Sequence, residues 1–197
     1  SSEFNSQYIN NEDDLLDMTV DRLTSGKVIG RFNGRFEWGP RSLGNRSILA
    51  DPRSNEMKDL VNTKIKFREP FRPFAPSALA EITESYFELP NATDNMAARF
   101  MLLVTNVHED KQDLIPAVSH MGTARVQTVY KETNSSYYNL IEKFGQSTGV
   151  PILLNTSLNL GGDCIAEEFD DALYILRNSQ INYLYLPELK IMILNQN

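Results

Sequence analysis

The fold is decided by a helix that leads directly into an apolar strand, Ser136-Tyr137-Tyr138-Asn139-Leu140-Ile141-Glu142-Lys143-Phe144-Gly145-Gln146-Ser147-Thr148-Gly149-Val150-Pro151-Ile152-Leu153-Leu154. Tyr137, Leu140, Ile141 and Phe144 recur at helical spacing, which predicts that this face of the helix points inward. Gly149 predicts the end of the helix, because glycine readily adopts the left-handed conformation that closes one. The apolar residues 151–154 then predict a buried strand. Such an alternation is typical of an α/β layered domain.

The rest of the chain continues this alternation. Helical spacing predicts helices over residues 13–25, 54–65 and 169–176. Apolar runs predict strands over residues 27–32, 99–107, 126–130, 183–186 and 190–194. The Gly- and Arg-rich segment 33–53 predicts a structured loop, and the Pro-rich run 69–77 must be extended or turning. We therefore expect one domain over residues 13–197, preceded by a loose segment over residues 1–12.

Composition excludes several classes of protein. The chain has 197 residues, of which 26 are acidic and 19 basic, and one cysteine, so no internal disulfide can form. No apolar run approaches the roughly 20 residues that cross a bilayer, and the first residues lack the pattern of a signal peptide. The net charge of −7 disfavours a nucleic-acid binder. A cytoplasmic globular domain is expected, and the absence of an initiator Met suggests an excised piece or a processed chain.

One segment reverses the overall charge. Residues 31–72 hold ten basic and five acidic side chains. A concentrated cationic segment suits a small anionic ligand, although a solvated basic face would have the same composition. Within it, Lys66 and Arg68 stand two residues apart. In an extended segment both would point to one side with Phe67 facing the core, and together they could clamp a carboxylate, carbamate or phosphate. On spacing alone, an exposed edge strand is favoured.

Ser157 and Asn159 repeat this spacing directly after the predicted strand 151–154. Ligands of α/β sheets gather beyond the carboxyl ends of strands, and Gly161-Gly162 would allow a ligand to approach the backbone closely. A polar turn that satisfies its own backbone is the competing interpretation. His108 and His120 have no neighbours at metal-ligand spacing, so we expect no metal site in this chain. Cys164 is expected to be a small buried residue.

Two longer strings carry a family resemblance, Gly39-Pro40-Arg41-Ser42-Leu43-Gly44-Asn45-Arg46-Ser47 and Phe71-Arg72-Pro73-Phe74-Ala75-Pro76. With segments 116–129, 137–159 and 170–186, they resemble the C-terminal domain of the nodulation-type O-carbamoyltransferases. That domain is in turn similar to the threonylcarbamoyl-adenylate synthases. The Lys-x-Arg signature of those enzymes falls on Lys66 and Arg68, and their Ser-x-Asn signature falls on Ser157 and Asn159.

The resemblance implies a twisted mixed sheet with flanking helices, and a domain that makes carbamoyl-adenylate from carbamoyl phosphate and ATP with Mg²⁺. An N-terminal half, which would carry the metal and acceptor sites, would then pass the carbamoyl group to a hydroxyl. Lys66, Arg68 and Arg41 would be catalytic. The substrate and nucleotide would be bound by Lys66, Arg68, Arg46, Arg72, Thr123, Arg125, Asn155, Ser157 and Asn159.

The segment from His120 to Thr123 is one residue shorter than the family pattern, which leaves the role of His120 open. The Gly- and Arg-rich loop, residues 34–53, is expected to face the N-terminal half and to be partly mobile without it. Two alternative functions stay open, a stand-alone threonylcarbamoyl-adenylate synthase of tRNA modification and a non-catalytic nucleotide-binding domain.

Overall fold

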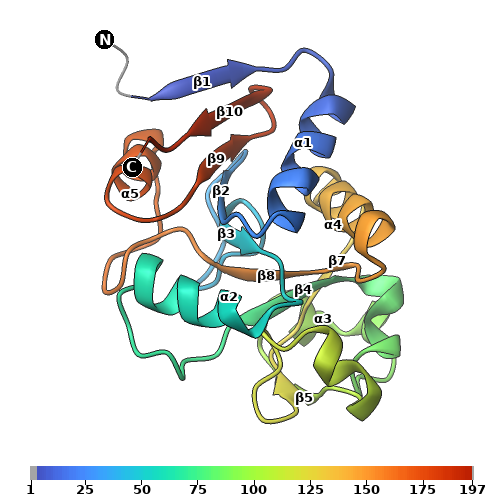
Figure 1. The fold of residues 1–197 in the computed structure, drawn as a ribbon. Helices are drawn as coiled ribbons and strands as arrows, with labels where there is room; N and C mark the ends of the chain where they lie inside the picture. The colour runs from blue at the N-terminus through green and yellow to red at the C-terminus, as the bar shows by residue number, and fades with distance from the viewer. Residues whose placement is uncertain (1–3, 197) are drawn as a thin grey trace.

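An eight-stranded mixed sheet forms the centre of the computed structural model, which describes residues 4–196 (Figure 1). Its strand order is β1-β10-β9-β2-β3-β8-β4-β7. The bounds in chain order are β1 Asn5–Tyr8, β2 Ile29–Phe32, β3 Arg46–Ala50, β4 Ala75–Leu79, β7 Gln127–Val129, β8 Ile152–Ser157, β9 Tyr183–Leu186 and β10 Ile191–Leu194. Two short strands, β5 Thr105–Asn106 and β6 Thr123–Ala124, form a separate two-stranded antiparallel sheet.

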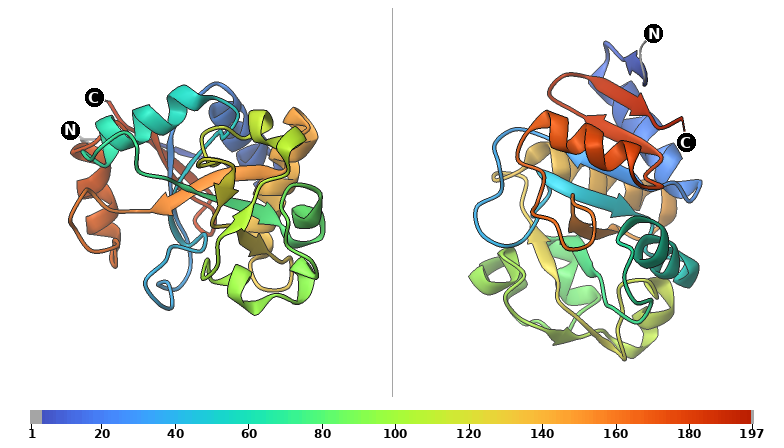
Figure 2. Two further views of the ribbon diagram at one scale, coloured as in Figure 1. Left: turned by 90° about the horizontal axis from the view of Figure 1, so that it is seen from below. Right: turned by 90° about the vertical axis from the view of Figure 1, so that its left-hand side faces the viewer.

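Helices cover both faces of the main sheet (Figures 1 and 2). On one face lie α1 Glu12–Thr24 and α4 Ser135–Thr148, and on the other lie α2 Asn55–Leu60, the π-helical turn η1 Val61–Ile65 and α5 Phe169–Arg177. The remaining short helices are η2 Ala80–Ser85, η3 Ala92–Asp94, α3 Met96–Arg99 and η4 Glu109–Leu114. Neighbouring strand residues such as Ile48 and Leu49 enter different core clusters, because side chains alternate across a sheet.

The predicted fold class is confirmed, and the segment that suggested it behaves as expected. Tyr137, Leu140, Ile141 and Phe144 of α4 are all fully buried. The Oδ1 atom of Asn134 accepts a hydrogen bond from the Tyr137 N–H and caps the start of the helix. Gly149 closes its end with φ +76°. Among residues 4–196, no helix is both long and apolar enough to cross a membrane.

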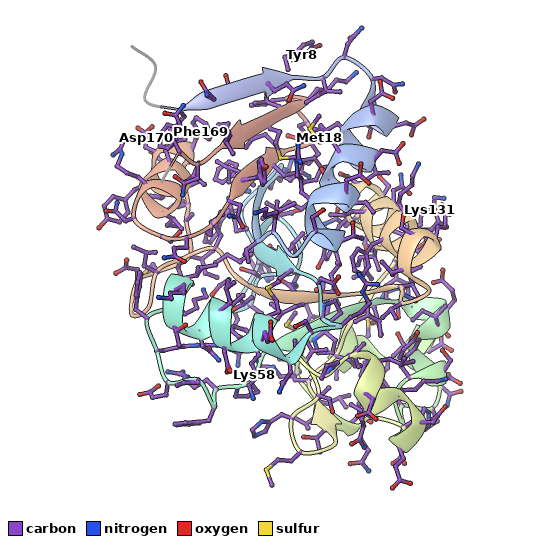
Figure 3. All side chains as sticks on the ribbon, viewed as in Figure 1. Tyr8, Met18, Lys58, Lys131, Phe169 and Asp170 are labelled. Atoms are coloured by element: carbon purple, nitrogen blue, oxygen red, sulfur yellow. The ribbon has the colours of Figure 1, made fainter. Side chains whose placement is uncertain are left out.

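Three predictions about where strands lie were wrong. Residues 99–107 do not form a central strand, because Met101 turns the chain with φ +54° and leaves Leu102 exposed. Segment 33–53 is not loop throughout: its last part is β3, which is fully paired between β2 and β8. Residues 5–8 are not loose, since they pair with β10, and Tyr8 projects outward from this edge strand (Figure 3).

Strand directions bring four chain segments to one edge of the sheet. Both β3 and β4 run antiparallel to β8, so they begin where β8 ends, with Ser47 opposite Ser157 and Ala75 opposite Asn155. Strand β7 runs parallel to β4 and begins at the same edge. The segments that precede β3, β4 and β7 therefore meet the end of β8.

Candidate active site

A polar cavity of about 130 Å³ lies at this edge of the sheet. Arg41 and Ser42 reach it from the segment before β3, Arg68 and Pro73 from the segment before β4, and Arg125 from the segment before β7. The end of β8 completes the wall with Asn155, Thr156 and Ser157, and the turn after α3 adds Met101. Five residues predicted from the sequence, Arg41, Arg68, Arg125, Asn155 and Ser157, thus line one cavity.

The cavity is strongly cationic. Three arginines line it, and among the described residues that form its wall none is acidic. Burial lowers the pKa of Arg125, and the charge of Arg41 lowers it further. Burial likewise lowers the pKa of Arg68, with Arg72 adding to the effect. The Nε atom of Arg125 is buried without a hydrogen-bond partner. Like charges held together at a partly buried position favour an anionic ligand that would separate them.

Lys66 lies beside this cavity and joins the two short motifs. Its side chain is 3% exposed, and its Nζ atom donates to the Ser157 carbonyl at 2.5 Å, the Asn159 carbonyl at 3.1 Å and Asn159 Oδ1 at 2.5 Å. All three acceptors are formally neutral. Burial, with a smaller contribution from Arg68, lowers the pKa of Lys66 to about 7. The Lys-x-Arg and Ser-x-Asn motifs therefore form one hydrogen-bonded unit.

The segment that carries Lys66 and Arg68 is not extended, which corrects the sequence prediction. Phe67 has φ +48° and is 62% exposed, so it points to solvent and not to the core. This left-handed turn sends Lys66 toward Asn159 while Arg68 lines the cavity. Gly161 explains how the two segments approach so closely: a Cβ atom there would lie 2.1 Å from the Lys66 carbonyl oxygen. Its small size thus serves contact with the protein's own backbone.

Asn62 orients Arg68, and nothing in the sequence singled it out. Its Oδ1 atom accepts from Arg68 Nε at 2.7 Å, and its Nδ2 atom donates to the Pro70 and Arg72 carbonyls, both at 3.0 Å. Asn62 is fully buried inside η1, where a π-helical turn changes the angular spacing of side chains. A predicted regular helix over residues 54–65 could not reveal that orientation.

Asn155 belongs to a buried polar network under the cavity. Its Nδ2 atom donates to Gln127 Oε1 at 2.9 Å, Ser77 Oγ at 3.0 Å and the Ser42 carbonyl at 3.1 Å. Its Oδ1 atom is buried without a hydrogen-bond partner. Gln127 also donates to the Leu43 carbonyl at 2.8 Å. The network ties β8, β4 and β7 to the loop that carries Arg41.

Arg46 and Arg72 were predicted as binding residues, but neither lines this cavity. Arg46 is 4% exposed, stacks on Phe32 and donates to the carbonyls of Asn33, Gly34 and Asn45. Its guanidinium therefore holds the protein's own backbone. Arg72 is exposed and lies 3.9 Å from Glu69, so it contributes charge near Arg68 without lining the cavity.

A second, mostly apolar cavity of about 200 Å³ adjoins the first and shares Pro73, Phe74, Ala75 and Arg125 with it. Thr123, predicted as a binding residue, lines this one together with His120. The Thr123 Oγ1 atom donates to the His120 carbonyl at 2.8 Å.

A larger depression of about 550 Å³ lies elsewhere. Its lining has three acidic residues, Glu12, Glu132 and Glu188, against the basic residues Arg35 and Lys190, so it suits an anion less well than the cationic cavity does. Cys164 is exposed, contrary to expectation. Within residues 4–196, no three His, Cys, Asp or Glu side chains are close enough to hold a metal ion.

Comparison with known protein families gives a match to the family described as carbamoyltransferase C-terminus, over residues 20–192. The chain is 47% identical over 166 residues to nodulation protein NolO of Bradyrhizobium diazoefficiens, covering 84% of this chain and 30% of that protein. It is 41% identical over 141 residues to nodulation protein U of Rhizobium tropici, covering 71% of this chain and 24% of that protein. It thus spans less than a third of the length of these relatives.

Two solved structures share the fold. A nucleotide- and phosphate-bound structure of HypF superposes with a TM-score of 0.57 at 14% identity, covering 93% of this chain and 24% of that one. HypF of T. kodakarensis gives a TM-score of 0.64 at 18% identity, covering 90% of this chain and 21% of that one.

Proposed function

The chain belongs to the carbamoyltransferase C-terminal family, and we propose that it forms carbamoyl-adenylate from carbamoyl phosphate and ATP. The observation that carries this proposal is the cavity in which Arg41, Arg68 and Arg125 converge without an acidic residue among the described lining side chains. A carbamate, a phosphate and a nucleotide are all anions that such a cavity would attract. Lys66, adjoining the cavity, would become fully protonated when one of them binds.

The chemistry of adenylation suits these residues. Carbamoyl phosphate first loses its phosphoryl group to water, which gives carbamate and inorganic phosphate. A carbamate oxygen then attacks the α-phosphorus of ATP, the bond from that phosphorus to the oxygen that bridges to the β-phosphate breaks, and pyrophosphate leaves. Neither step needs a protein nucleophile. The protein must align the two reactants and neutralise charge on the phosphate oxygens. We assign Lys66 and Arg68 to the carbamoyl end, and Arg41 and Arg125 to the phosphates. Ser157 and Asn159 hold Lys66 Nζ and thereby position it at the carbamoyl end. We propose that they also contact the nucleotide.

The adjoining apolar cavity supports the proposal that the chain binds a nucleotide. Its walls of Pro73, Phe74 and Val104 offer apolar surface for a flat base, while Arg125 is shared with the cationic cavity. Mg²⁺ would enter with ATP, neutralise phosphate charge when bound, and take its ligands from phosphate oxygens and water. Among the described residues, neither cavity has an Asp or Glu in its lining, which agrees with a Mg²⁺ ion held by phosphate and water.

The surface around the cavities supports a covering domain. Six large apolar side chains lie within two residues of a lining residue or line a cavity themselves, and each is 62–91% exposed: Trp38, Phe67, Phe71, Leu102, Val104 and Met121. Large apolar side chains exposed near a site favour contact with another protein surface. We propose that the N-terminal part of a longer polypeptide packs here, with loop 34–45 at the contact, and transfers the carbamoyl group to a hydroxyl.

The test is product analysis. The chain is incubated with Mg²⁺, carbamoyl phosphate and ATP labelled at the α-phosphate, and labelled AMP derivatives are separated by chromatography. We expect a carbamoyl-adenylate that needs carbamoyl phosphate for its formation. Product formed only with threonine and bicarbonate would indicate a threonylcarbamoyl-adenylate synthase instead. ATP binding without any product would indicate a non-catalytic nucleotide-binding domain.

A further inference from the structure

Arg31 is a charged residue in the interior with an unusual set of partners. It lies on β2 and is fully buried. Its guanidinium donates to the Gly44 carbonyl and, at 3.1 Å, to Ser136 Oγ, and it lies 5.3 Å from the Tyr137 ring centroid. Burial lowers the pKa of Arg31, yet arginine stays protonated in proteins. Among residues 4–196, no carboxylate forms an ion pair with it, so its burial needs another explanation.

Glu37 carries the opposite charge and binds the other end of the peptide unit whose carbonyl accepts from Arg31. It is 7% exposed, and its Oε1 atom accepts hydrogen bonds from the Asn45 N–H at 2.7 Å and the Arg46 N–H at 2.9 Å. The Gly44 carbonyl and the Asn45 N–H are the two ends of one peptide unit. This peptide is therefore held between a cation at its oxygen and an anion at its nitrogen, an arrangement that compensates both buried charges.

This arrangement closes a loop. Glu37 begins the loop and binds Asn45 at its end, so residues 38–44 are held from both sides. The carbonyls of Ser42 and Leu43 accept from Asn155 and Gln127, so three successive carbonyls of this loop are fixed by side chains below it. Gly44 packs on Tyr137 so closely that a Cβ atom would lie 2.4 Å from the ring. Arg41, carried by this loop, lines the cationic cavity.

We infer that Arg31 and Glu37 are positioning residues: they hold the Gly44–Asn45 peptide from opposite ends and thereby fix Arg41 at the cavity. Neither residue lines the cavity itself. The inference rests on the proposed function where it concerns ligand affinity. It stands independently of that function where it concerns the mobility of the loop.

Trp38 makes the mobility measurable. It is the only tryptophan of the chain, it follows Glu37 directly, and it is 90% exposed. Time-resolved fluorescence anisotropy of Trp38 therefore reports on this loop alone. ATP affinity, measured by calorimetry with Mg²⁺ present, reports on the cationic cavity that Arg41 lines. The variants are Arg31→Met, Arg31→Lys and Glu37→Gln, with Arg53→Met as the matched control, because Arg53 pairs with Asp51 away from the loop.

In Arg31→Met we expect a larger fast component in the Trp38 anisotropy and a loss of ATP affinity of roughly tenfold, the size expected for a charge-assisted contact. Arg31→Lys and Glu37→Gln should each show a smaller change in anisotropy and a smaller loss of ATP affinity than Arg31→Met. Arg53→Met should show neither change. Adding Arg41→Ala to Arg31→Met should reduce affinity by less than it does alone, since Arg41 is already displaced.

A folded Arg31→Met or Glu37→Gln protein with wild-type anisotropy would overturn the inference, and so would a mobile loop with unchanged ATP affinity. If Arg31→Met fails to fold, Glu37→Gln decides in its place. A wild-type chain that binds no ATP would contradict the proposed function. The anisotropy alone would then test whether Arg31 and Glu37 hold the loop.

Discussion

Lys66 and Arg68 are the residues whose loss should affect ligand binding most. Arg68 lines the cavity, and its Nε atom is held by Asn62, which leaves the terminal amino groups for a ligand. Losing a charge-assisted hydrogen bond costs about 1.5–3 kcal/mol. We expect Arg68→Ala and Lys66→Ala to weaken carbamoyl phosphate binding by this amount and to stop carbamoyl-adenylate formation. Arg68→Lys should also weaken binding, because a point charge replaces a planar fork. Calorimetric titration measures the change.

Lys64→Ala is the control for this pair, since Lys64 lies in the same segment but is exposed. It should bind like wild type. Normal adenylate formation by folded Lys66→Ala and Arg68→Ala proteins would show that another group binds the carbamoyl end.

Lys66 should also make ligand binding depend on pH. Its pKa in the unliganded protein is about 7, so above pH 7 a bound anion must first draw a proton onto Nζ. Affinity should therefore fall as pH rises through 7, and calorimetry in buffers of different ionisation enthalpy should detect proton uptake. In Lys66→Met, affinity should be lower and should not change across this range. A wild-type affinity that does not change with pH would mean that Lys66 remains uninvolved in binding.

The lowered pKa of Lys66 should also make the stability of the fold depend on pH. Stability should rise with pH, whereas ligand affinity should fall. An ordinary lysine pKa of 10.5 describes the unfolded chain, so between pH 7 and 10.5 the unfolded chain binds more protons than the folded one. By linkage, the free energy of unfolding that this group contributes rises with pH across this window. Urea denaturation should show that wild type gains stability relative to Lys66→Met as pH rises from 7. An equal pH dependence in both proteins would contradict the assignment.

At the scale of elements, the site depends on contact between the loop after β8 and the segment after η1. Gly161→Ala should separate them, because the new Cβ atom would collide with the Lys66 carbonyl. We expect a loss of about 1–3 kcal/mol in unfolding free energy, the range for overpacking, and a loss of ligand affinity as Lys66 moves from Asn159. Denaturant titration and calorimetry measure the two effects.

Gly162→Ala provides the matched control. Gly162 has φ +92° but open space around its Cβ position, so alanine strains the backbone without touching Lys66. It should lower stability and leave affinity nearly unchanged. If both variants reduced affinity equally, the contact between Gly161 and Lys66 would not explain the result.

Elements with a clear period could be predicted from the sequence, whereas segments shaped by long-range contacts could not. Helix α4 shows the first case, since its buried face and its glycine stop are local features. Strand β3 shows the second: the polar residues Arg46 and Ser47 conceal it. In the structure Arg46 donates to the Asn33 carbonyl across the loop, and Ser47 Oγ accepts from the Gly44 N–H. The Arg99–Val107 error has the same origin, because apolar content does not distinguish a strand from a turn.

The candidate site was predicted in composition but not in geometry. The pairs Lys66–Arg68 and Ser157–Asn159 were recognised by spacing and by resemblance, and they do form one unit. Their spacing suggested extended segments, whereas the left-handed Phe67 and the close approach of Gly161 create the contact. Asn62 carries no sequence signal at all, because its role depends on a π-helical turn.

The whole molecule should be unable to carbamoylate an alcohol by itself. Such a transfer needs a base or a metal to activate the hydroxyl, and a pocket to hold the acceptor. The cationic cavity offers arginines, which stay protonated, and the described residues hold no metal-binding cluster. Lys66 has a pKa of about 7, but an anion bound at the carbamoyl end would keep it protonated, so it would not serve as a base for the acceptor hydroxyl.

We therefore expect that this chain, given ATP, Mg²⁺, carbamoyl phosphate and a panel of sugar or antibiotic alcohols, yields carbamoyl-adenylate without carbamoylated alcohol. Adding the N-terminal part of a full-length relative should yield the carbamoylated product, detected by mass spectrometry. Replacing exposed Trp38 and Phe71 by serine should reduce that transfer, because both belong to the apolar surface around the cavity, and should spare adenylate formation. Efficient carbamoylation by this chain alone would place the acceptor site within it and contradict the division of labour between two parts.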